Sequence, residues 1–195
     1  MTRILRTTLA ALFAALCLAG GAQAAGGNFV FVGGSDEARE QVRSALEASR
    51  FDWDVVPEQV TIQISGCGCG GARPGVIVLD EDILVSSPFG PRYAWGIVQH
   101  EYAHQVDFLL FGRSERRAIR RVLGGADWCY ERPGLGHDDH GCERFATMSA
   151  WSYWRSPDNV QRPDWAARPP VRPVAFRRLV NRLVAQAVER RSSAL

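Results

Sequence analysis

The sequence contains no lysine, so arginine carries all of its positive charge. We attribute this bias to genome composition rather than to function. The chain has 23 arginines and 21 acidic residues, and loss of an N-terminal segment that holds Arg3 and Arg6 would leave 21 of each sign. A chain without an excess of either charge offers no global argument for binding nucleic acid or a membrane. We therefore expect no nucleic-acid partner.

A hydrophobic run long enough to cross a bilayer is also lacking. The apolar stretch at residues 9–19 is too short to span one comfortably. Two arginines precede it and Ala22-Gln23-Ala24 follows it, which is the pattern of a secretory signal peptide. We expect residues 1–24 to be a signal peptide that is cleaved after Ala24. The product would be a secreted, extracellular protein without a membrane span.

The CxxC spacing of zinc ribbons is absent, since Cys67 and Cys69 form a CxC instead. Signal cleavage removes Cys17 and leaves these two cysteines together with Cys129 and Cys142. Four cysteines in an exported protein predict two disulfides. We favour Cys129 with Cys142, because they bracket one loop. Cys67 with Cys69 would then close a tight, geometrically awkward ring, so a cross-pairing of the two loops stays open.

Helical and strand patterns alternate along the chain without an internal repeat, and they predict an α+β fold. Strands are expected at residues 28–32, 60–64 and 76–79. The glycine-rich segment between the last two suggests an antiparallel pair, with residues 76–79 at a sheet edge. Helices are expected at residues 36–49, 92–111, 114–123 and 142–154, with Gly112 ending the second of them.

The C-terminal part divides into two segments. Residues 156–173 hold five of the ten prolines and predict an extended connector. Residues 174–195 predict an amphipathic helix that docks on the domain through its apolar face. Its arginine-rich face suggests a second interpretation, attachment to an anionic surface or partner. The arginine run in helix 114–123 is interpreted as a solvated face.

The motif that carries chemistry is His100-Glu101-Tyr102-Ala103-His104, an HExxH. Residues four apart on a helix share one face, so both imidazoles can bind one zinc ion. Glu101 is placed to hold a metal-activated water and to act as its general base. The spacing HExxHxxGxxH is excluded, because Leu110 stands where its third histidine would be.

A third ligand must come from elsewhere in the chain, and we favour Glu143. It opens a helix whose shared face carries Ala146 and Ala150, and these small residues allow close approach to the HExxH helix. His137 and His140 are the alternatives. Asp107, three residues after His104, is better suited to supporting a ligand imidazole than to binding the metal.

HEYAH followed by an ERFAT helix resembles the gluzincin group of zinc peptidases, in which two histidines and a glutamate bind the metal. The segments VQHEYAHQVDF, WCYERPG and GCERFATMSAWSYWRSPDN also resemble small, secreted, largely uncharacterised bacterial proteins. The resemblance covers most of residues 28–160. It implies a compact zincin-like catalytic domain at residues 25–155, in which the edge strand, residues 76–79, can pair with a substrate backbone.

The chain departs from the gluzincin pattern at one position. Many gluzincins carry an acid four residues after the ligand glutamate, where it supports a ligand histidine, and this chain has Thr147 there. We expect both Asp107 and Thr147 to lie behind the ligands, and either Asp107 takes over this supporting role or the site is tuned weaker.

Zincins commonly stabilise the tetrahedral oxyanion with a Tyr or His beyond the metal. Tyr130, His137, His140 and Tyr153 qualify by residue type, although residues 137–140 also fit a polar turn that caps the next helix.

These features predict a secreted, monomeric zinc metallopeptidase that uses Zn²⁺ and acts on a peptide or protein substrate. Two alternatives stay open. One is a catalytically silent zinc-binding interaction module, and the other is a zinc amidase that cleaves a cell-wall amide.

Overall fold

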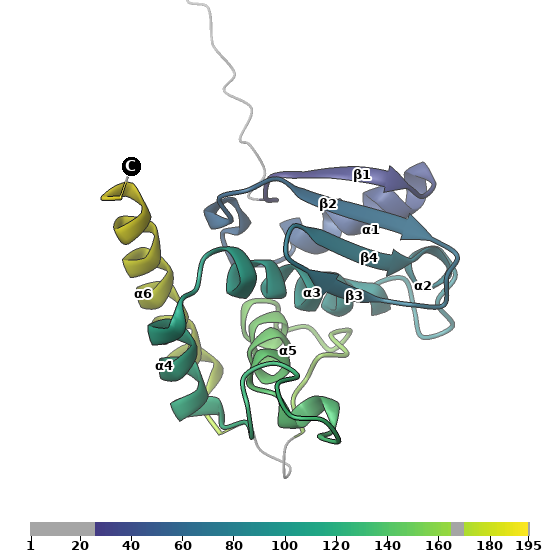
Figure 1. Cartoon of the computed structure of the whole chain (residues 1–195). Coiled ribbons are helices and arrows are strands. Elements are labelled where there is room, and N and C mark those ends of the chain that lie inside the picture. The colour runs from purple at the N-terminus through teal and green to yellow at the C-terminus, as the bar shows by residue number, and fades with distance from the viewer. Residues whose placement is uncertain (1–25, 165–169, 195) are drawn as a thin grey trace, which may run out of the picture.

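A four-stranded mixed sheet and six α-helices form a compact α+β fold in the computed structural model, which describes residues 26–164 and 170–194 (Figure 1). The strands are β1 (Phe29–Gly33), β2 (Val60–Ser65), β3 (Gly71–Arg73) and β4 (Val76–Asp80). The predicted signal peptide, residues 1–24, lies outside the described residues.

The strand order is β1-β2-β4-β3. The directions of the strands differ from the prediction for β2 and β4. β2 runs parallel to both β1 and β4, so the expected antiparallel pairing of residues 60–64 with 76–79 is wrong. The glycine-rich segment holds a strand of its own, β3, which forms the antiparallel hairpin with β4. β4 is therefore internal, and β3 takes the edge position that we expected for residues 76–79.

The main helices are α1 (Asp36–Glu47), α3 (Tyr93–Leu109), α4 (Arg113–Leu123), α5 (Gly141–Tyr153) and α6 (Pro173–Ser192). Each coincides with a predicted helix to within about three residues. A single-turn helix, α2 (Glu81–Val85), and the 3₁₀ turn η1 (Trp53–Val55) were not predicted, because they are too short to give a periodic pattern. The 3₁₀ turn η2 (His137–Asp139) lies within the polar turn that residues 137–140 suggested.

One helix boundary also differs from the prediction. Gly112 caps the start of α4 rather than the end of α3, because its backbone N–H donates to the Glu115 carboxylate at 2.9 Å. α3 ends two residues earlier than expected, at Leu109.

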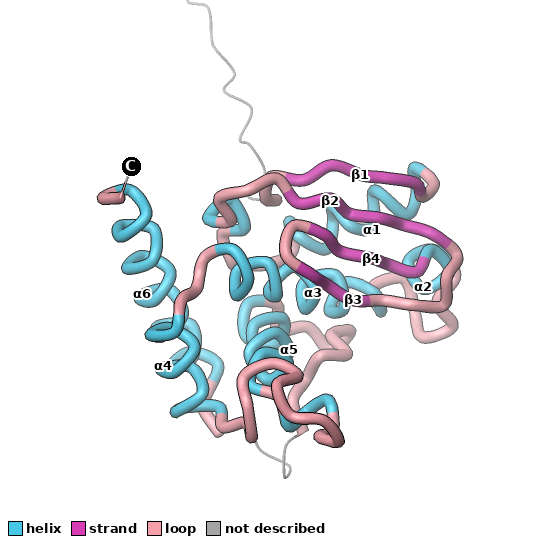
Figure 2. Tube along the Cα trace, in the orientation of Figure 1, coloured by secondary structure: helices cyan, strands magenta, loops and turns pink. Residues whose placement is uncertain are grey.

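The core forms where α1 and α3 cover one face of the sheet. Ser35 caps α1 by accepting from the Ala38 N–H, and the helix then buries a stripe of small and aliphatic residues. Tyr102 of α3 lies fully buried and meets Phe29 of β1 edge to face. α3 is thus held between the sheet on one side and α5 on the other (Figures 1 and 2).

α6 packs on α5 through Phe176 and Val180, both fully buried. The predicted connector at 156–173 contains residues 165–169, which lie outside the described part of the chain. None of the described helices combines the length and the apolar character needed to cross a membrane.

Two disulfides are present. Cys129 is joined to Cys142 with the Cα atoms 5.3 Å apart, as we favoured from the sequence. Cys67 is joined to Cys69 at 5.1 Å, so the CxC does close its tight ring and the cross-pairing does not occur.

Candidate metal centre

The HExxH motif lies in the middle of α3, where its position is fixed from two sides. Gln99 donates to the Ala45 carbonyl of α1 at 2.7 Å. On the other side of the helix, Gln105 accepts from the Gly75 N–H at 2.8 Å and so binds the β3–β4 turn. A buried glutamine on each side of the two histidines therefore prevents α3 from sliding or rotating.

Glu143 approaches the motif from the first turn of α5. Ala146 and Ala150 behind it are fully buried, and α3 and α5 pack closely, as the small residues predicted. The Oε2 atom of Glu143 lies 3.1 Å from the Nε2 of His100 and 3.3 Å from the Nε2 of His104. The two Nε2 atoms are 3.2 Å apart.

These three atoms form a nearly equilateral triangle of the size that a tetrahedral zinc ion requires. Ligand atoms at about 2.0–2.1 Å from zinc lie roughly 3.3 Å from one another in a tetrahedron. The side chains of His100, His104 and Glu143 are each less than a tenth exposed, so water does not separate them. Two imidazole nitrogens and a carboxylate oxygen are also a donor set that zinc prefers. The residues could hold such a metal ion.

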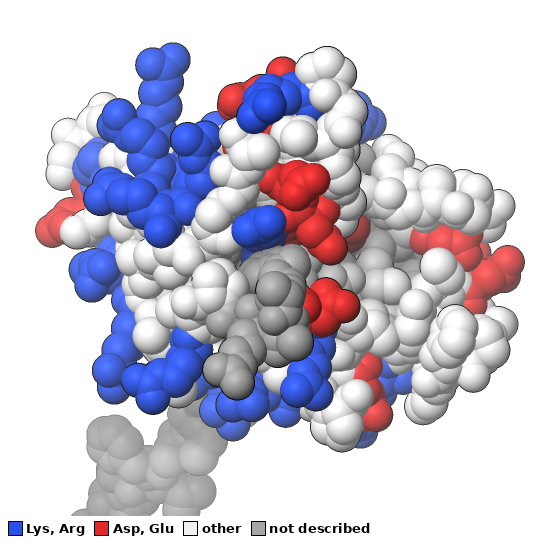
Figure 3. All heavy atoms as spheres, turned by 90° about the horizontal axis from the view of Figure 1, so that it is seen from below, with Lys and Arg blue, Asp and Glu red and all other residues white. Residues whose placement is uncertain are grey.

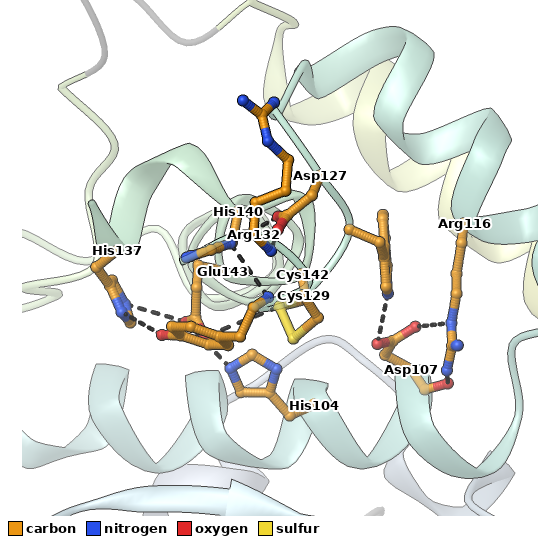
Figure 4. Close-up of a disulfide and its surroundings, with 12 residues drawn as sticks. His104, Asp107, Arg116, Asp127, Cys129, Arg132, His137, His140, Cys142 and Glu143 are labelled. Carbon is orange, nitrogen blue, oxygen red and sulfur yellow. Dashed lines mark hydrogen bonds and ion pairs between the residues drawn. A yellow bond between two sulfur atoms is a disulfide. The ribbon is translucent and has the colours of Figure 1, made fainter. Parts of the chain in front are cut away.

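Two of the four oxyanion candidates face this triangle from the loop between α4 and α5. His137 points toward Glu143 (Figure 4) and places its Nε2 3.0 Å from the Glu143 carboxylate. The Tyr130 hydroxyl lies 2.9 Å from the other ring nitrogen of His137. Both side chains are more than half exposed. Tyr130 has a positive φ of 55°, which is unusual for a residue with a side chain.

The other two candidates lie elsewhere. His140 is buried beneath Tyr130 and its Nδ1 lies 2.6 Å from the Asp127 carboxylate, so it holds the loop together rather than facing the cleft. Tyr153 ends α5 and donates its hydroxyl to Asn181 of α6 at 2.5 Å. Residue type alone could not distinguish these two from Tyr130 and His137.

The cluster of charges shifts the acid–base properties of its members. Burial raises the pKa of Glu101, and the neighbouring histidines only partly offset this. Burial also acts on Glu143, but hydrogen bonds from His100 and His104 outweigh it and lower the pKa of that carboxyl. Burial and the nearby Glu143 raise the pKa of Tyr130 to about 12, so its hydroxyl keeps its proton at neutral pH. Glu143 is thus held as an anion.

The residues behind the ligands differ from the prediction in one respect. The Asp107 carboxylate accepts from Arg116 Nε at 2.7 Å and from Trp128 Nε1 at 3.0 Å, and it makes no hydrogen bond to a ligand histidine. Thr147 supports His100 instead, with its hydroxyl 3.3 Å from Nδ1. The Nδ1 of His104 is buried without a partner in the described structure.

A cleft of about 340 Å³ opens beside the triangle. Glu101 and Phe108 of α3 line one side, the β3 edge at Gly71 and Ala72 another, and Tyr130 and His137 a third. The Cys129–Cys142 disulfide ties this last wall to α5 directly next to Glu143 (Figure 4).

Three residues that shape the cleft were missed from the sequence: Gln105, Phe108 and Asp127. A polar residue in an apolar helix, such as Gln105 in α3, indicates that a buried side chain needs a hydrogen-bond partner. The sequence does not show which group that partner is.

Comparison with known protein families, curated proteins and solved structures finds no match to this chain.

Proposed function

We propose that this chain is a secreted, zinc-dependent metallopeptidase of the gluzincin type. The observation that carries the proposal is the triangle formed by His100, His104 and Glu143, whose edges match a tetrahedral zinc ion. The order of elements is consistent with a zincin-like fold, because a helix and a small sheet precede the HExxH helix and the glutamate helix follows it. The two disulfides are compatible with export to an oxidising compartment.

In this proposal His100, His104 and Glu143 would hold the metal beside the cleft. Bound zinc would supply Lewis acidity, which lowers the pKa of water and polarises a carbonyl. Glu101 lines the same cleft, and its carboxylate has no hydrogen-bond partner among the described residues. Its carboxylate can accept a proton from the attacking water and later deliver it to the leaving amine.

Tyr130 and His137 would complete the polar side of the reaction. The Tyr130 hydroxyl retains its proton at neutral pH, and His137 lies between it and the ligand carboxylate. Either group can donate a hydrogen bond to the oxygen that becomes negatively charged when the carbonyl is attacked. The disulfide beside them keeps their loop close to α5.

The β3 edge is the surface on which we place the substrate backbone. β3 pairs with β4 on one side, no described strand pairs with its other side, and Gly71 and Ala72 line the cleft. An extended peptide can add to such an edge through main-chain hydrogen bonds. A peptide in this position would lie across the cleft with its carbonyl groups near the metal ligands.

The proposal is tested by combining metal analysis with a cleavage assay on a denatured protein substrate. We expect one zinc per chain in the wild type and in Glu101→Gln, but loss of cleavage by at least about a hundredfold in that variant. His100→Ala and Glu143→Ala should lose zinc as well as cleavage. Glu47→Gln, an exposed change on α1, should retain both.

Two results would refute the peptidase. Zinc retained in both His100→Ala and Glu143→Ala would show that the metal binds elsewhere. Stoichiometric zinc without peptide cleavage would favour either the silent binding module or the amidase. Release of an amine from cell-wall fragments would then identify the amidase.

A further inference from the structure

Positive charge is concentrated on α4 and α6, although positive and negative residues nearly balance over the whole chain. Together these helices hold ten of the 23 arginines and two of the 21 acidic residues. The rest of the chain after residue 24 holds eleven arginines and nineteen acidic residues. The two helices lie at one side of the molecule (Figure 1), and arginines cluster on the corresponding side in the space-filling view (Figure 3). The molecule is therefore electrostatically two-sided.

Four of these ten arginines attach the helices to the rest of the fold. Arg116 pairs with Asp107, Arg177 donates to the Ser152 carbonyl, and Arg190 pairs with Glu115 across the α4–α6 contact. Arg191 donates to the Leu109 carbonyl and lies near Glu58.

The side chains of the other six arginines are exposed, and they make no hydrogen bond, ion pair or ring contact within the described residues. We call this group the arginine face: Arg113, Arg117, Arg120, Arg121, Arg178 and Arg182.

The arginine face has a regular geometry. Residues 113, 117, 120 and 121 fall within an arc of roughly 100° on α4, since each residue advances about 100° around the helix. Arg178 and Arg182 lie one turn apart on α6. Like charges four residues apart repel one another and destabilise a helix slightly. An anionic partner would remove this repulsion.

The opposite sides of both helices are committed to the core. Ile119 and Leu123 of α4 and Phe176 and Val180 of α6 are buried. Most large apolar side chains of both helices are therefore turned away from solvent, although Val174 and Val188 of α6 are exposed. We expect contact at the arginine face to be made mainly by the guanidinium groups. These groups are planar and bind phosphate oxygens in pairs.

We propose that the arginine face binds the phosphate groups of an anionic lipid surface and holds the protein there peripherally. Six unpaired arginines fall within the range of basic clusters that bind anionic membranes. The two disulfides are compatible with export to an oxidising compartment, where lipid phosphates are more accessible than nucleic acid. The excess acid on the rest of the chain repels the same surface, so the molecule binds in one orientation.

The test measures sedimentation of the purified protein with vesicles. The probe vesicles contain equal parts of phosphatidylglycerol and phosphatidylcholine, and pure phosphatidylcholine vesicles are the neutral comparison. The test variant changes Arg117, Arg121, Arg178 and Arg182 to Gln. The matched control changes Arg43, Arg50, Arg92 and Arg155 to Gln, which lowers the net charge equally on other surfaces.

We expect the wild type and the control to bind anionic vesicles, and to bind neutral vesicles weakly. Affinity should fall about fivefold for each arginine removed from the arginine face, and it should fall for the wild type as salt is raised. Because the side chains of the four test residues make no hydrogen bond, ion pair or ring contact within the described fold, the melting temperature of the test variant should equal or exceed that of the wild type.

Three results would overturn the proposal. The control could lose as much affinity as the test variant, which would show that net charge alone matters. The wild type could bind neutral and anionic vesicles alike. Duplex DNA could displace the protein from vesicles at a lower phosphate concentration than free anionic lipid does, which would identify nucleic acid as the partner. None of these measurements depends on zinc or on peptide cleavage, so the proposed activity and the lipid contact can fail separately.

Discussion

At the scale of single residues, the two histidines of the candidate metal centre are supported unequally. His100 has the Thr147 hydroxyl at 3.3 Å from its Nδ1, whereas the Nδ1 of His104 is buried without a partner among the described residues. A hydrogen bond to the outer nitrogen fixes the orientation of a metal-binding imidazole and raises its basicity. In the proposed metal site Thr147 would give this support to His100, whereas the Asp107 carboxylate is bonded to Arg116 and Trp128.

Thr147→Val tests this role, because it removes the hydroxyl and keeps the shape of the side chain. We expect zinc affinity to fall about 10- to 100-fold, since the orientation of His100 is no longer fixed. Competition with a chromogenic chelator measures the change. Ser149→Ala is the control, because this hydroxyl on the same helix is also buried but has no partner. Equal zinc affinity in Thr147→Val and the wild type would contradict the assignment.

At the scale of elements, the side chains of Glu115 and Gln105 fix the position of the segments around the site. Glu115 holds the start of α4 by accepting from the Gly112 N–H and from the Ser114 hydroxyl, and Arg190 of α6 pairs with the same carboxylate. Gln105 holds the β3–β4 turn against α3. Glu115 and Gln105 each bond backbone groups, at the start of α4 and in the β3–β4 turn, that have no partner in the helix or hairpin to which they belong.

Glu115 should make stability depend on pH. Burial opposes its ionisation, but the Gly112 N–H, the Ser114 hydroxyl and Arg190 outweigh burial and lower the pKa of Glu115 below its usual value. A carboxyl with a lowered pKa in the folded state stabilises the fold above its unfolded pKa, and this contribution is lost as pH falls. Glu115→Gln should therefore cost about 1 kcal/mol near pH 7 and progressively less below about pH 4.

Urea unfolding of the wild type and of Glu115→Gln at several pH values measures this difference. Glu37→Gln, an exposed residue in the first turn of α1, is the comparison. A cost of Glu115→Gln that stays constant across the acid range would show that the carboxylate charge is not responsible.

Gln105→Leu should loosen the β3–β4 hairpin and leave the metal ligands in place. The Gly75 N–H and the Arg73 and Val76 carbonyls lose their partner, at a cost of about 1 kcal/mol for each hydrogen bond, because these groups are only partly buried. We expect faster hydrogen exchange in residues 71–78, a higher KM for peptide cleavage and unchanged zinc affinity.

Gln99→Leu is the matched change on the opposite side of α3, where the lost bond is to Ala45. It should lower global stability without a selective effect on the hairpin. Hairpin amides that stay as protected in Gln105→Leu as in the wild type would contradict the role of Gln105.

At the scale of the whole molecule, local patterns predicted the main helices, three of the four strands and the residues that converge at the candidate metal centre, but not the pairing of the strands. The spacing of His100 and His104 and the small residues behind Glu143 are local, because a helix presents them on one face whatever the fold. The direction of β4 depends on where the chain travels between residues 65 and 76, and the short strand β3 inside a glycine-rich segment leaves no alternating pattern. The sequence also could not show that His140 points away from the cleft. Its partner is Asp127, and the fold of the loop determines this pairing.

The arginine face is another property of the whole molecule. The sequence shows basic stripes on two separate helices, and each taken alone fits a solvated surface. The ion pair between Arg190 and Glu115 joins the two helices. In the fold, four of their arginines attach to neighbouring elements, and the side chains of the other six have no partner among the described residues.

The central claim is that His100, His104 and Glu143 bind the metal, and X-ray absorption at the zinc edge of the zinc-loaded protein tests it most directly. We predict nitrogen and oxygen ligands at about 2.0–2.1 Å, the multiple-scattering signature of two imidazoles, and no sulfur. Cys129, Cys142 and Glu143 form the rival cluster in the described chain, and they would bind a metal only with the disulfide reduced. A sulfur shell at about 2.3 Å, or the signature of a single imidazole, would contradict the account.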